Sequence, residues 1–360
     1  MTLLSYFLNK TFYALLTIFG VVTVIFFLFN VLPGDPAQMM LGQNEDSEQL
    51  ALVKQKYGFD KPVSTQYLYY LNDLSPISYH SNDQVDYTFL REGKYSATKL
   101  ISLGKTSVVL KFPYLRESFT KQGKKVSEVL KETLPNTFVL AVSAIIIAII
   151  LGIILGVISA LFKDKLLDKI IQIFSTLGMS IPSFFSAILF AWFFGYVLHK
   201  YTNLEMTGSL YELDDFGEKN VIQWKNLILP AVVLGIRPLA VIIQLMRNSL
   251  LEVFNQDYIR TARAKGLSEY QVIKKHAVKN ALNPVVTAIS GWFASMLAGA
   301  VFVEYVFGWN GLGKEIVNAL NTLDLPVIMG SVLIIALMFI IINIFVDIIY
   351  AWLDPKVKLQ

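Results

Sequence analysis

Six apolar runs, each about as long as a membrane is thick, restrict the possible folds of this chain more than any other feature. Each run is close to the roughly 20 residues that a helix needs to cross about 30 Å of hydrocarbon. Because hydrocarbon offers no water to backbone amides and carbonyls, a run that crosses it must be helical. The sequence therefore predicts an all-α integral membrane protein with six transmembrane helices. We place them at 12–32, 137–160, 171–198, 227–246, 285–304 and 328–350.

The composition agrees with a membrane protein and provides few residues for catalysis or metal binding. Of the 360 residues, 54% are hydrophobic and 16% are charged, against about 25% charged residues in an ordinary soluble domain. The chain has no cysteine, which excludes disulfides, thiolate metal sites and cysteine nucleophiles. His80, His199 and His276 are scattered and predict no metal site. We also find no catalytic triad and no paired carboxylates, so we expect no enzymatic activity in this chain.

The predicted helices divide the chain into three parts. Residues 1–32 hold the N-terminus and the first helix, 33–136 form a long segment, and 137–360 hold five helices around the loop 247–284. The first run is longer than the roughly 7–15 apolar residues of a signal peptide, so we expect an uncleaved anchor. The third run contains Ser180-Ile181-Pro182, and we expect it to break or kink there because proline removes a helical hydrogen bond.

The distribution of Lys and Arg predicts the orientation. Short cytoplasmic segments are enriched in these residues, whereas long segments are translocated largely regardless of charge. With the N-terminus in the cytoplasm, the short inner segments carry thirteen Lys and Arg residues and the short outer segments carry four. Both termini and 247–284 are therefore predicted to be cytoplasmic, with 33–136 outside.

The loop 247–284 has the signals of two short helices joined by a tight turn. Asp257 is predicted to cap a helix that runs to Ala264, and Gly266 to end it in a left-handed conformation. Ser268 and Gln271 have the spacing of a capping box for a second helix. Asn283-Pro284 is predicted to close the loop before the fifth transmembrane helix.

One face of this helical elbow carries small residues. Ala262 and Gly266 are four residues apart, so we expect them to let another protein approach closely. Basic side chains flank that face: Arg260, Arg263, Lys265, Lys274, Lys275 and Lys279. A solvated loop that only fixes the topology is the alternative, but the paired helix caps favour an ordered docking element.

The stretch "VFGWNGLGKEI" (306–316) has the glycine and lysine spacing of a phosphate-binding loop. Such a loop needs a Ser or Thr after the lysine to hold Mg²⁺, whereas this chain has Glu315. The orientation also places 305–327 outside, away from cytoplasmic ATP. We therefore interpret Gly308, Gly311 and Gly313 as a tight outer turn.

Several motifs, in order, resemble one family. "DYIRTARAKGLSEYQVIKKHAVKNALNPVV" is similar to the EAA loop of bacterial ABC-importer permeases, in the dipeptide/oligopeptide/nickel branch. The resemblance covers about 1–76 and 107–357, while 77–106 looks like an insertion without an assigned role. Further matching motifs are "FLFNVLPGDP", "VSEVLKETLPNT", "LGMSIPSFF", "LILPAVVLG", "VFVEYVFGWNGLGK" and "DPKVK".

The resemblance implies a type I ABC-importer permease fold in the inner membrane, with an external insert between helices 1 and 2. It implies a second homologous permease, two cytoplasmic ATPase subunits that bind ATP and Mg²⁺, and an extracytoplasmic substrate-binding protein. This chain itself would bind no cofactor, metal or nucleic acid. In the family the EAA loop forms the coupling helix that contacts the ATPase, which here corresponds to Asp257, Arg260, Thr261, Ala262, Ala264, Lys265, Gly266 and Leu267.

Peptides are the expected cargo. Nickel or another small solute is the alternative within the family, and an ion-coupled secondary carrier is the alternative outside it. Such carriers usually have carboxylates or broken-helix ion sites at the midplane, and no predicted helix here has a mid-membrane Asp or Glu. We expect Glu304 and Asp347, at helix ends, to be interfacial.

This sequence departs from the family pattern at Thr261 and Arg263, in the EAA triplet, and at Arg237, in the fourth helix before Pro238. A charge at mid-bilayer costs about 2.5–3.5 kcal/mol on insertion scales, so Arg237 should face protein or a wet cavity. One hypothesis is that Arg237 and Pro238 line the translocation path, where Arg237 meets a peptide carboxylate. The alternative is that Arg237 pairs with carbonyls freed by Pro238 or with a neighbouring subunit.

Overall fold

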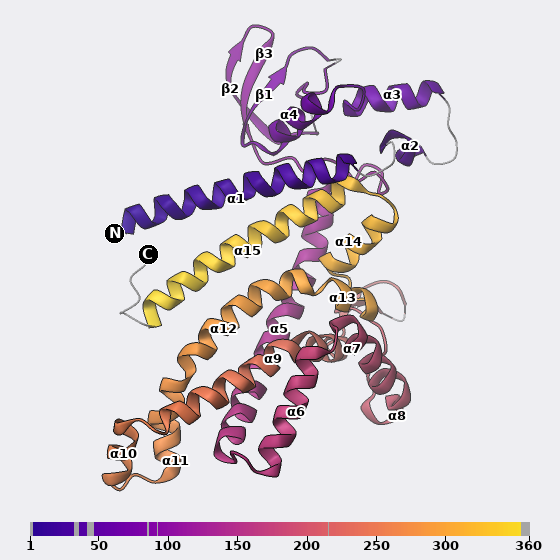
Figure 1. Cartoon of the computed structure of the whole chain (residues 1–360). Coiled ribbons are helices and arrows are strands. Elements are labelled where there is room, and N and C mark those ends of the chain that lie inside the picture. The colour runs from indigo at the N-terminus through magenta and orange to yellow at the C-terminus, as the bar shows by residue number, and fades with distance from the viewer. Residues whose placement is uncertain are drawn as a thin grey trace. The chain divides into compact units, whose positions relative to one another are not determined.

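The computed structural model describes residues 3–31, 36–41, 47–84, 86–91, 93–214 and 216–353. The chain forms two compact units, whose elements are labelled in Figure 1. The N-terminal unit comprises Lys10–Glu132 and Asn318–Ala336, and the core unit comprises Met1–Asn9, Thr133–Val317 and Leu337–Gln360. The closing motif "DPKVK" lies outside the described residues.

The N-terminal unit contains a small sheet, which corrects the all-α prediction. Strands β1 (Ile77–Ser81), β2 (Ala97–Leu103) and β3 (Thr106–Lys111) pair antiparallel in the order β1–β3–β2. Buried side chains alternate along β1 and β3 with the period of two that a half-buried strand requires. Residues 77–106 therefore supply two of the three strands, and the stretch "TSVVLKF" contains β3.

Helices make up much of the rest of this unit, and the stretches "SEQLALVKQKYG" and "STQYLYYLNDL" contain two of them. Phe26 of the first long helix packs on Tyr70, with ring centroids 5.6 Å apart, so apolar contacts join that helix to the small helices. The helices are α1 (Leu3–Val31), α2 (Pro36–Leu41), α3 (Ser47–Tyr57) and α4 (Val63–Leu74).

Asp73, at the end of α4, is the polar centre of the N-terminal unit. Its side chain is 1% exposed and accepts hydrogen bonds from Tyr87 Oη (2.7 Å), Tyr95 Oη (3.1 Å) and Arg116 Nε (3.1 Å). Lys111 Nζ donates to its backbone carbonyl. Because Tyr87 and Tyr95 lie between β1 and β2 while Lys111 ends β3 and Arg116 follows it, one buried residue of α4 holds the helices and the sheet together.

A second carboxylate ties distant parts of the same unit together. Asp324 is buried and accepts hydrogen bonds from Phe119 N (3.1 Å) and Thr120 Oγ1 (2.8 Å), more than 200 residues earlier in the chain. Ser118 Oγ donates to the same carboxylate. These bonds explain why Asn318–Ala336 belongs with the N-terminal residues.

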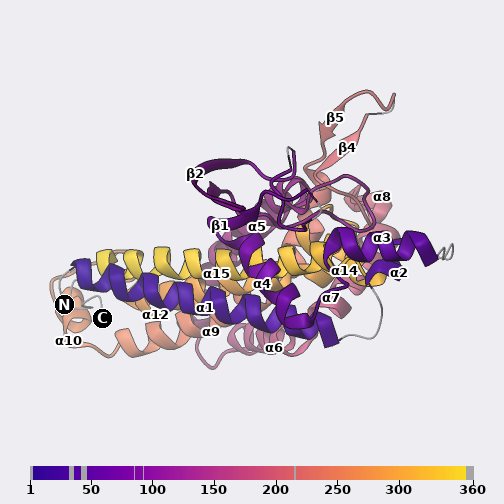
Figure 2. The same ribbon diagram turned by 90° about the horizontal axis from the view of Figure 1, so that it is seen from above.

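The core unit is built mainly from long helices and a short hairpin, which Figure 2 shows at β4 and β5. The terminal helix α15 and the first long helix of this set, α5, also extend into the N-terminal unit. The elements are α5 (Val126–Leu161), α6 (Leu166–Ser180), α7 (Ser183–Phe190), the π-helix η1 (Ala191–Val197), α8 (His199–Thr202), β4 (Tyr211–Leu213), β5 (Asn220–Ile222), α9 (Lys225–Val253), α10 (Asp257–Ala264), α11 (Glu269–Gln271), the π-helix η2 (Val272–Ala277), α12 (Val278–Gly299), α13 (Val301–Phe307), α14 (Leu312–Asn321) and α15 (Leu325–Leu353).

Within the described residues, four helices are long and apolar enough to cross a membrane: α1, α5, α9 and α15. Two bent pairs bring the number to six if each pair is one span. The third predicted run bends by 112° between α6 and α7, which confirms the break expected at Ser180-Ile181-Pro182. The fifth bends by 57° between α12 and α13, a bend that the sequence analysis did not predict.

Glycine lets α5 and α9 approach closely. A Cβ atom on Gly235 of α9 would lie 2.9 Å from the carbonyl oxygen of Ala144, and one on Gly156 of α5 would meet Met246. Small residues serve this purpose in membrane helices, where contact rather than the hydrophobic effect holds helices together. The core of the unit forms around this crossing.

We predict that Asp73→Asn destabilises the N-terminal unit. The substitution leaves the Arg116 charge without its carboxylate, and breaking a buried ion pair from one side costs about 3–5 kcal/mol. Pulse proteolysis of the full chain in detergent, at increasing urea, measures the stability of residues 47–125 against cleavage. Asp86→Asn, at an exposed position of the same unit, is the control and should change stability by less than about 0.5 kcal/mol. Equal midpoints for both variants would contradict the central role of Asp73.

Candidate functional site

The loop 247–284 forms an ordered elbow at the ends of α9 and α12 (Figure 1). Gly266 has φ +81°, as expected for the residue that ends α10. Ser268 caps α11, and both hydrogen bonds of the capping box with Gln271 are present. The local signals in the sequence thus predicted the end of α10 and the start of α11 correctly.

The elbow is seated on the core unit through its own apolar side chains. Ile259 and Val272 are fully buried, and Ala262 is 6% exposed. They belong to one cluster with Leu250 and Ala277, on the stems that lead into and out of the elbow. The prediction that Ala262 faces a partner is therefore wrong, because the small residue lets α10 pack against the chain itself.

Two further local predictions need correction. Gln256, not Asp257, is the N-cap of α10, and Asp257 lies in the first turn with its side chain 3.6 Å from Arg260. The helix α12 runs through Pro284 instead of starting after it. Ala281 and Val285 on that helix are fully buried, and this packing outweighs the roughly 3 kcal/mol that an interior proline costs.

The remaining residues predicted to couple form the outward surface of the elbow. Leu267 is half-buried and the others are exposed: Asp257, Arg260, Thr261, Ala264, Lys265 and Gly266. The sequence analysis missed two aromatic side chains there, Tyr258 at 42% and Tyr270 at 68% exposure. Exposed tyrosines beside basic residues are typical of interfaces, where tyrosine and arginine supply much of the binding energy.

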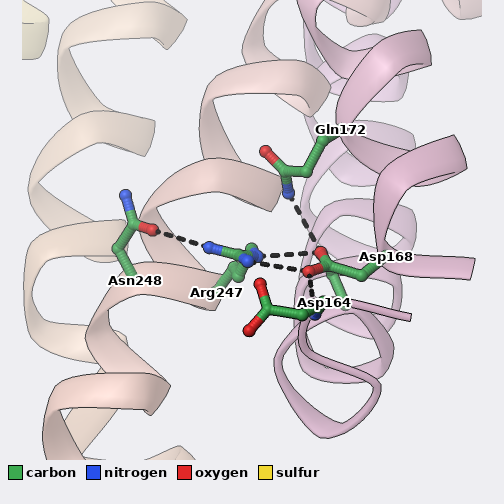
Figure 3. A network of polar contacts seen from close by, with 6 residues as sticks. Asp164, Asp168, Gln172, Arg247 and Asn248 are labelled. Carbon is green, nitrogen blue, oxygen red and sulfur yellow. Dashed lines mark hydrogen bonds and ion pairs between the residues drawn. The ribbon is translucent and has the colours of Figure 1, made fainter. Parts of the chain in front are cut away.

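An ion pair between a partly exposed arginine and a buried carboxylate fixes the stem of the elbow to a neighbouring helix (Figure 3). On α9, Arg247 donates from Nε (2.8 Å) and Nη2 (2.7 Å) to both carboxylate oxygens of Asp168, at the start of α6. Asp168 also accepts from Ser159 Oγ (2.5 Å) at the end of α5 and from the backbone amide of Asp164 (2.9 Å). Three helices therefore meet at one carboxylate, which no motif in the sequence indicates.

The glycine-rich turn after α13 is held by a buried carboxylate. Glu304 is fully buried, and its Oε2 accepts from the amides of Gly313 (2.6 Å) and Lys314 (3.2 Å), where α14 begins. A Cβ atom on Gly311 would collide with this carboxylate, and Gly308 has φ +68°. Glu304 is thus enclosed by the protein, and its position at the membrane interface stays a prediction, while the side chain of Asp347 lies outside the described residues.

The same turn is fastened to the start of the second apolar run. Trp309 is fully buried, and its Nε1 donates to the carbonyl of Asn136 (3.0 Å). Asn136 Nδ2 donates to the carbonyl of Asn310 (2.7 Å), and Lys314 Nζ donates to the carbonyl of Gly308 (3.0 Å). Because Glu304 and these bonds occupy the groups that would hold a phosphate, the turn is not a nucleotide-binding loop.

Arg237 lines a cleft of about 80 Å³ in the core unit. Its side chain is exposed, and no hydrogen bond or ion pair joins it to another described residue, which excludes pairing with the carbonyls near Pro238 in this part of the chain. Ser183 at the start of α7 and Trp292 and Ser295 on α12 line the same cleft. The free cation therefore lies beside the break between α6 and α7.

Among the described residues, no three His, Asp or Glu side chains come close enough to hold a metal ion.

Comparisons with known proteins agree on one family. The chain matches the family described as "binding-protein-dependent transport system inner membrane component" over residues 152–359, and the N-terminal model of the same family over 3–87. Among solved structures, a chain of the inward-facing MetNI methionine ABC transporter matches 63% of this chain and 97% of its own length, with 16% identity and a TM-score of 0.48.

Curated relatives match over nearly the whole chain. The dipeptide transport system permease protein DppB of Alkalihalophilus pseudofirmus is 30% identical over 99% of this chain and all of its own length. The di/tripeptide transport system permease protein DppB of Pseudomonas aeruginosa is 32% identical over 96% of both chains. The glutathione transport system permease protein GsiC of Salmonella choleraesuis is 30% identical over 99% of both.

We predict that Asp168→Asn and Arg247→Gln each lower the stability of the core unit by about 3–5 kcal/mol, because each leaves a buried charge or its partners unsatisfied. The double variant should lose less than the sum of the two, since the interaction is already absent in each single variant. Thermal unfolding of the detergent-solubilised chain measures all three. The control is Glu269→Gln, which breaks a similar pair with Arg263 on the exposed surface and should cost less than about 1 kcal/mol. Strict additivity would contradict the interaction.

Proposed function

The chain belongs to the family of binding-protein-dependent transport system inner membrane components, and we propose that it is the permease subunit of an ATP-driven peptide importer. Permeases of this family are not enzymes, and ATP is hydrolysed by a separate subunit. The relatives named as dipeptide, di/tripeptide and glutathione permeases support peptides as the cargo.

The complete transporter contains this chain, a second homologous permease, two cytoplasmic ATPase subunits that bind ATP and Mg²⁺, and a substrate-binding protein outside. The permease has the type I importer fold with six spans, two of them the bent pairs α6–α7 and α12–α13. Both termini and the elbow are cytoplasmic, and the N-terminal insert faces outward. The excess of Lys and Arg in the short segments on one side supports this orientation.

The observation that carries the proposal is the seating of the elbow. Its apolar side is packed into the core unit through Ile259, Ala262 and Val272, while Tyr258 and Tyr270 remain exposed with the basic residues. An ordered surface of aromatic and basic side chains fits a protein partner better than a solvated loop does. We assign this surface, residues 257–271, as the contact with the ATPase.

Motion of the ATPase pair would reach the membrane through rigid elements. Because the elbow continues into α12 without a break and is packed on α9, a push on residues 257–271 moves both helices. Arg247 and Asp168 pass the movement from α9 to α6. The result is a rigid-body switch between inward-open and outward-open states, of the kind that couples distant sites.

The cleft at Arg237 is our candidate for the cargo path. Arg237 has no partner among the described residues, and α7 begins at Ser183 without a side-chain cap at Pro182. The start of a helix carries partial positive charge, so both features favour an anion. A peptide supplies one at its terminal carboxylate. Gly308, Gly311 and Gly313 would form the outer turn of this path.

The function is tested by reconstituting the chain with its partner subunits in liposomes. Uptake of a dipeptide should require ATP and persist when an uncoupler collapses the ion gradients. An ion-coupled carrier would show the opposite dependence.

In the same system we predict that Gly266→Trp abolishes peptide-stimulated ATP hydrolysis, because it places a large side chain on the docking surface.

Gly217→Trp is a matched control for that variant. Gly217 is also exposed, has φ +72° and has open space at its Cβ position, but it lies in the turn between β4 and β5. Both variants therefore carry the same backbone strain, and only Gly266→Trp alters the elbow. Normal peptide-stimulated ATP hydrolysis in Gly266→Trp would refute the docking assignment.

For the cleft, we predict that Arg237→Gln lowers ATP-driven uptake of a dipeptide at least about tenfold, the effect of losing one charge-assisted hydrogen bond. Uptake of the same dipeptide with an amidated C-terminus should change little, since it lacks the carboxylate. Lys200→Gln, on α8, removes a charge outside the cleft and serves as the control. Equal loss for the acid and the amide would assign Arg237 a structural role.

A further inference from the structure

A second cleft lies in the N-terminal unit and has no assigned role. It has a volume of about 290 Å³, and its walls include Tyr57 of α3 and Tyr114 and Arg116, which follow β3. Tyr87 and Lys94 come from the segment between β1 and β2. The insertion 77–106 therefore supplies part of this cleft.

Lys94 is held at the cleft by aromatic rings. Its Nζ lies 4.0 Å from the ring centroid of Tyr87, 4.7 Å from that of Tyr95 and 5.6 Å from that of Tyr114. Nζ also donates to the backbone carbonyl of Tyr87 (3.1 Å). No carboxylate of the described residues lies within ion-pair distance of this ammonium group, so the charge is stabilised by ring faces and one carbonyl.

Arg116 places a second cation at the same cleft. Its backbone has φ +68°, which residues other than glycine rarely adopt, and its Nε is committed to Asp73. No hydrogen bond joins its two terminal guanidinium nitrogens to other described residues. Its guanidinium therefore has donors left for a ligand.

The balance of charge around the cleft is positive. Lys56 and Arg91 join Lys94 and Arg116 in the described lining, against the single carboxylate of Glu117. Asp73 lies behind this wall and is already bonded to Arg116, Tyr87 and Tyr95. The volume far exceeds the roughly 10–15 Å³ that one water molecule needs by the same measure, so a small organic molecule fits.

We propose that this cleft binds a small ligand through a carboxylate group, which lies between Lys94 and Arg116, with an apolar part against the tyrosine rings. Cations at the centre select the charge, and the rings of Tyr57, Tyr87 and Tyr114 select a flat or aliphatic group beside it. The site lies within the N-terminal unit and is separate from the cleft at Arg237. It does not depend on the proposed transport function.

The test uses the full chain in nanodiscs of phosphatidylcholine, without ATP or partner subunits. Equilibrium dialysis measures binding of N-acetylphenylalanine, which has one carboxylate and one ring and no amine that titrates. N-acetylphenylalaninamide differs only in lacking the charge, and inorganic phosphate is an anion without a ring. We expect the acid to bind at least about tenfold more tightly than either, which is the contribution of a charge-assisted hydrogen bond.

Variants locate the site. Lys94→Met should weaken binding of the acid at least about tenfold while keeping the apolar stem on the rings. Lys105→Gln, an exposed lysine at the turn between β2 and β3, should leave binding unchanged. Unchanged binding in Lys94→Met, loss of binding in Lys105→Gln, equal binding of the amide or phosphate, or no binding to the unmodified chain would each overturn the proposal.

A pH profile adds a readout that a structural role of Lys94 would not give. Burial lowers the pKa of Lys94 to about 8, against the opposing effect of Asp73, with Arg116 and Arg91 lowering it further and Glu117 raising it. The ammonium form is therefore lost as pH rises through about 8, and affinity should fall about tenfold between pH 7 and about 9.5. Lys94→Arg keeps its charge over this range, so its affinity should stay constant, and a parallel decline in both proteins would overturn the proposal.

Discussion

A backbone amide in hydrocarbon has only its own helix for a partner, and this constraint accounts for much of the core unit. Where a helix is continuous, as in α9, the backbone amides of each turn bond to the carbonyls of the turn before. Even Pro230 and Pro238 are accommodated within it. Where a span is broken, other groups must form the hydrogen bonds that the helix no longer provides to the backbone. At the end of α6 the amide of Ile181 still bonds to the carbonyl of Leu177 (3.0 Å), and at the start of α14 the Glu304 carboxylate binds two free amides. The breaks are therefore stabilised features of the fold.

The same constraint separates structural charges from functional ones. Asp168 and Arg247 satisfy each other with two hydrogen bonds, and Oε2 of Glu304 accepts from two backbone amides, whereas its Oε1 has no hydrogen-bond partner among the described residues. Arg237 is different, because it has no partner among the described residues and lies beside a broken span. In the N-terminal unit, Asp73 neutralises Arg116, while Lys94 has only ring faces and a carbonyl. We assign ligands to Arg237, Lys94 and Arg116, the cations with hydrogen-bond donors that no described residue accepts.

The features that the sequence predicted correctly depend on neighbouring residues, and most of those that it missed depend on distant ones. The capping box at Ser268, the left-handed Gly266 and the break before Pro182 are local, and all three are present. By contrast, whether Ala262 points outward depends on the position of α9, and the burial of Glu304 depends on how the chain returns after Gly308. The strands of 77–106 were also missed, since β1 pairs with β3 about thirty residues later. Sequence periodicity alone cannot supply such partners.

The inward position of Ala262 changes how the elbow should work. Had the small face been free, a partner could have bound the elbow without moving the helices behind it. Instead, Ile259, Ala262 and Val272 fill the space between the stems, so a force on the exposed side is carried directly into α9 and α12. The Arg247–Asp168 pair then joins α9 to α6, which ends at the break beside the Arg237 cleft. On this proposal, the apolar contacts of the elbow with α9 and α12 and the Arg247–Asp168 ion pair connect the ATPase contact to the cargo path.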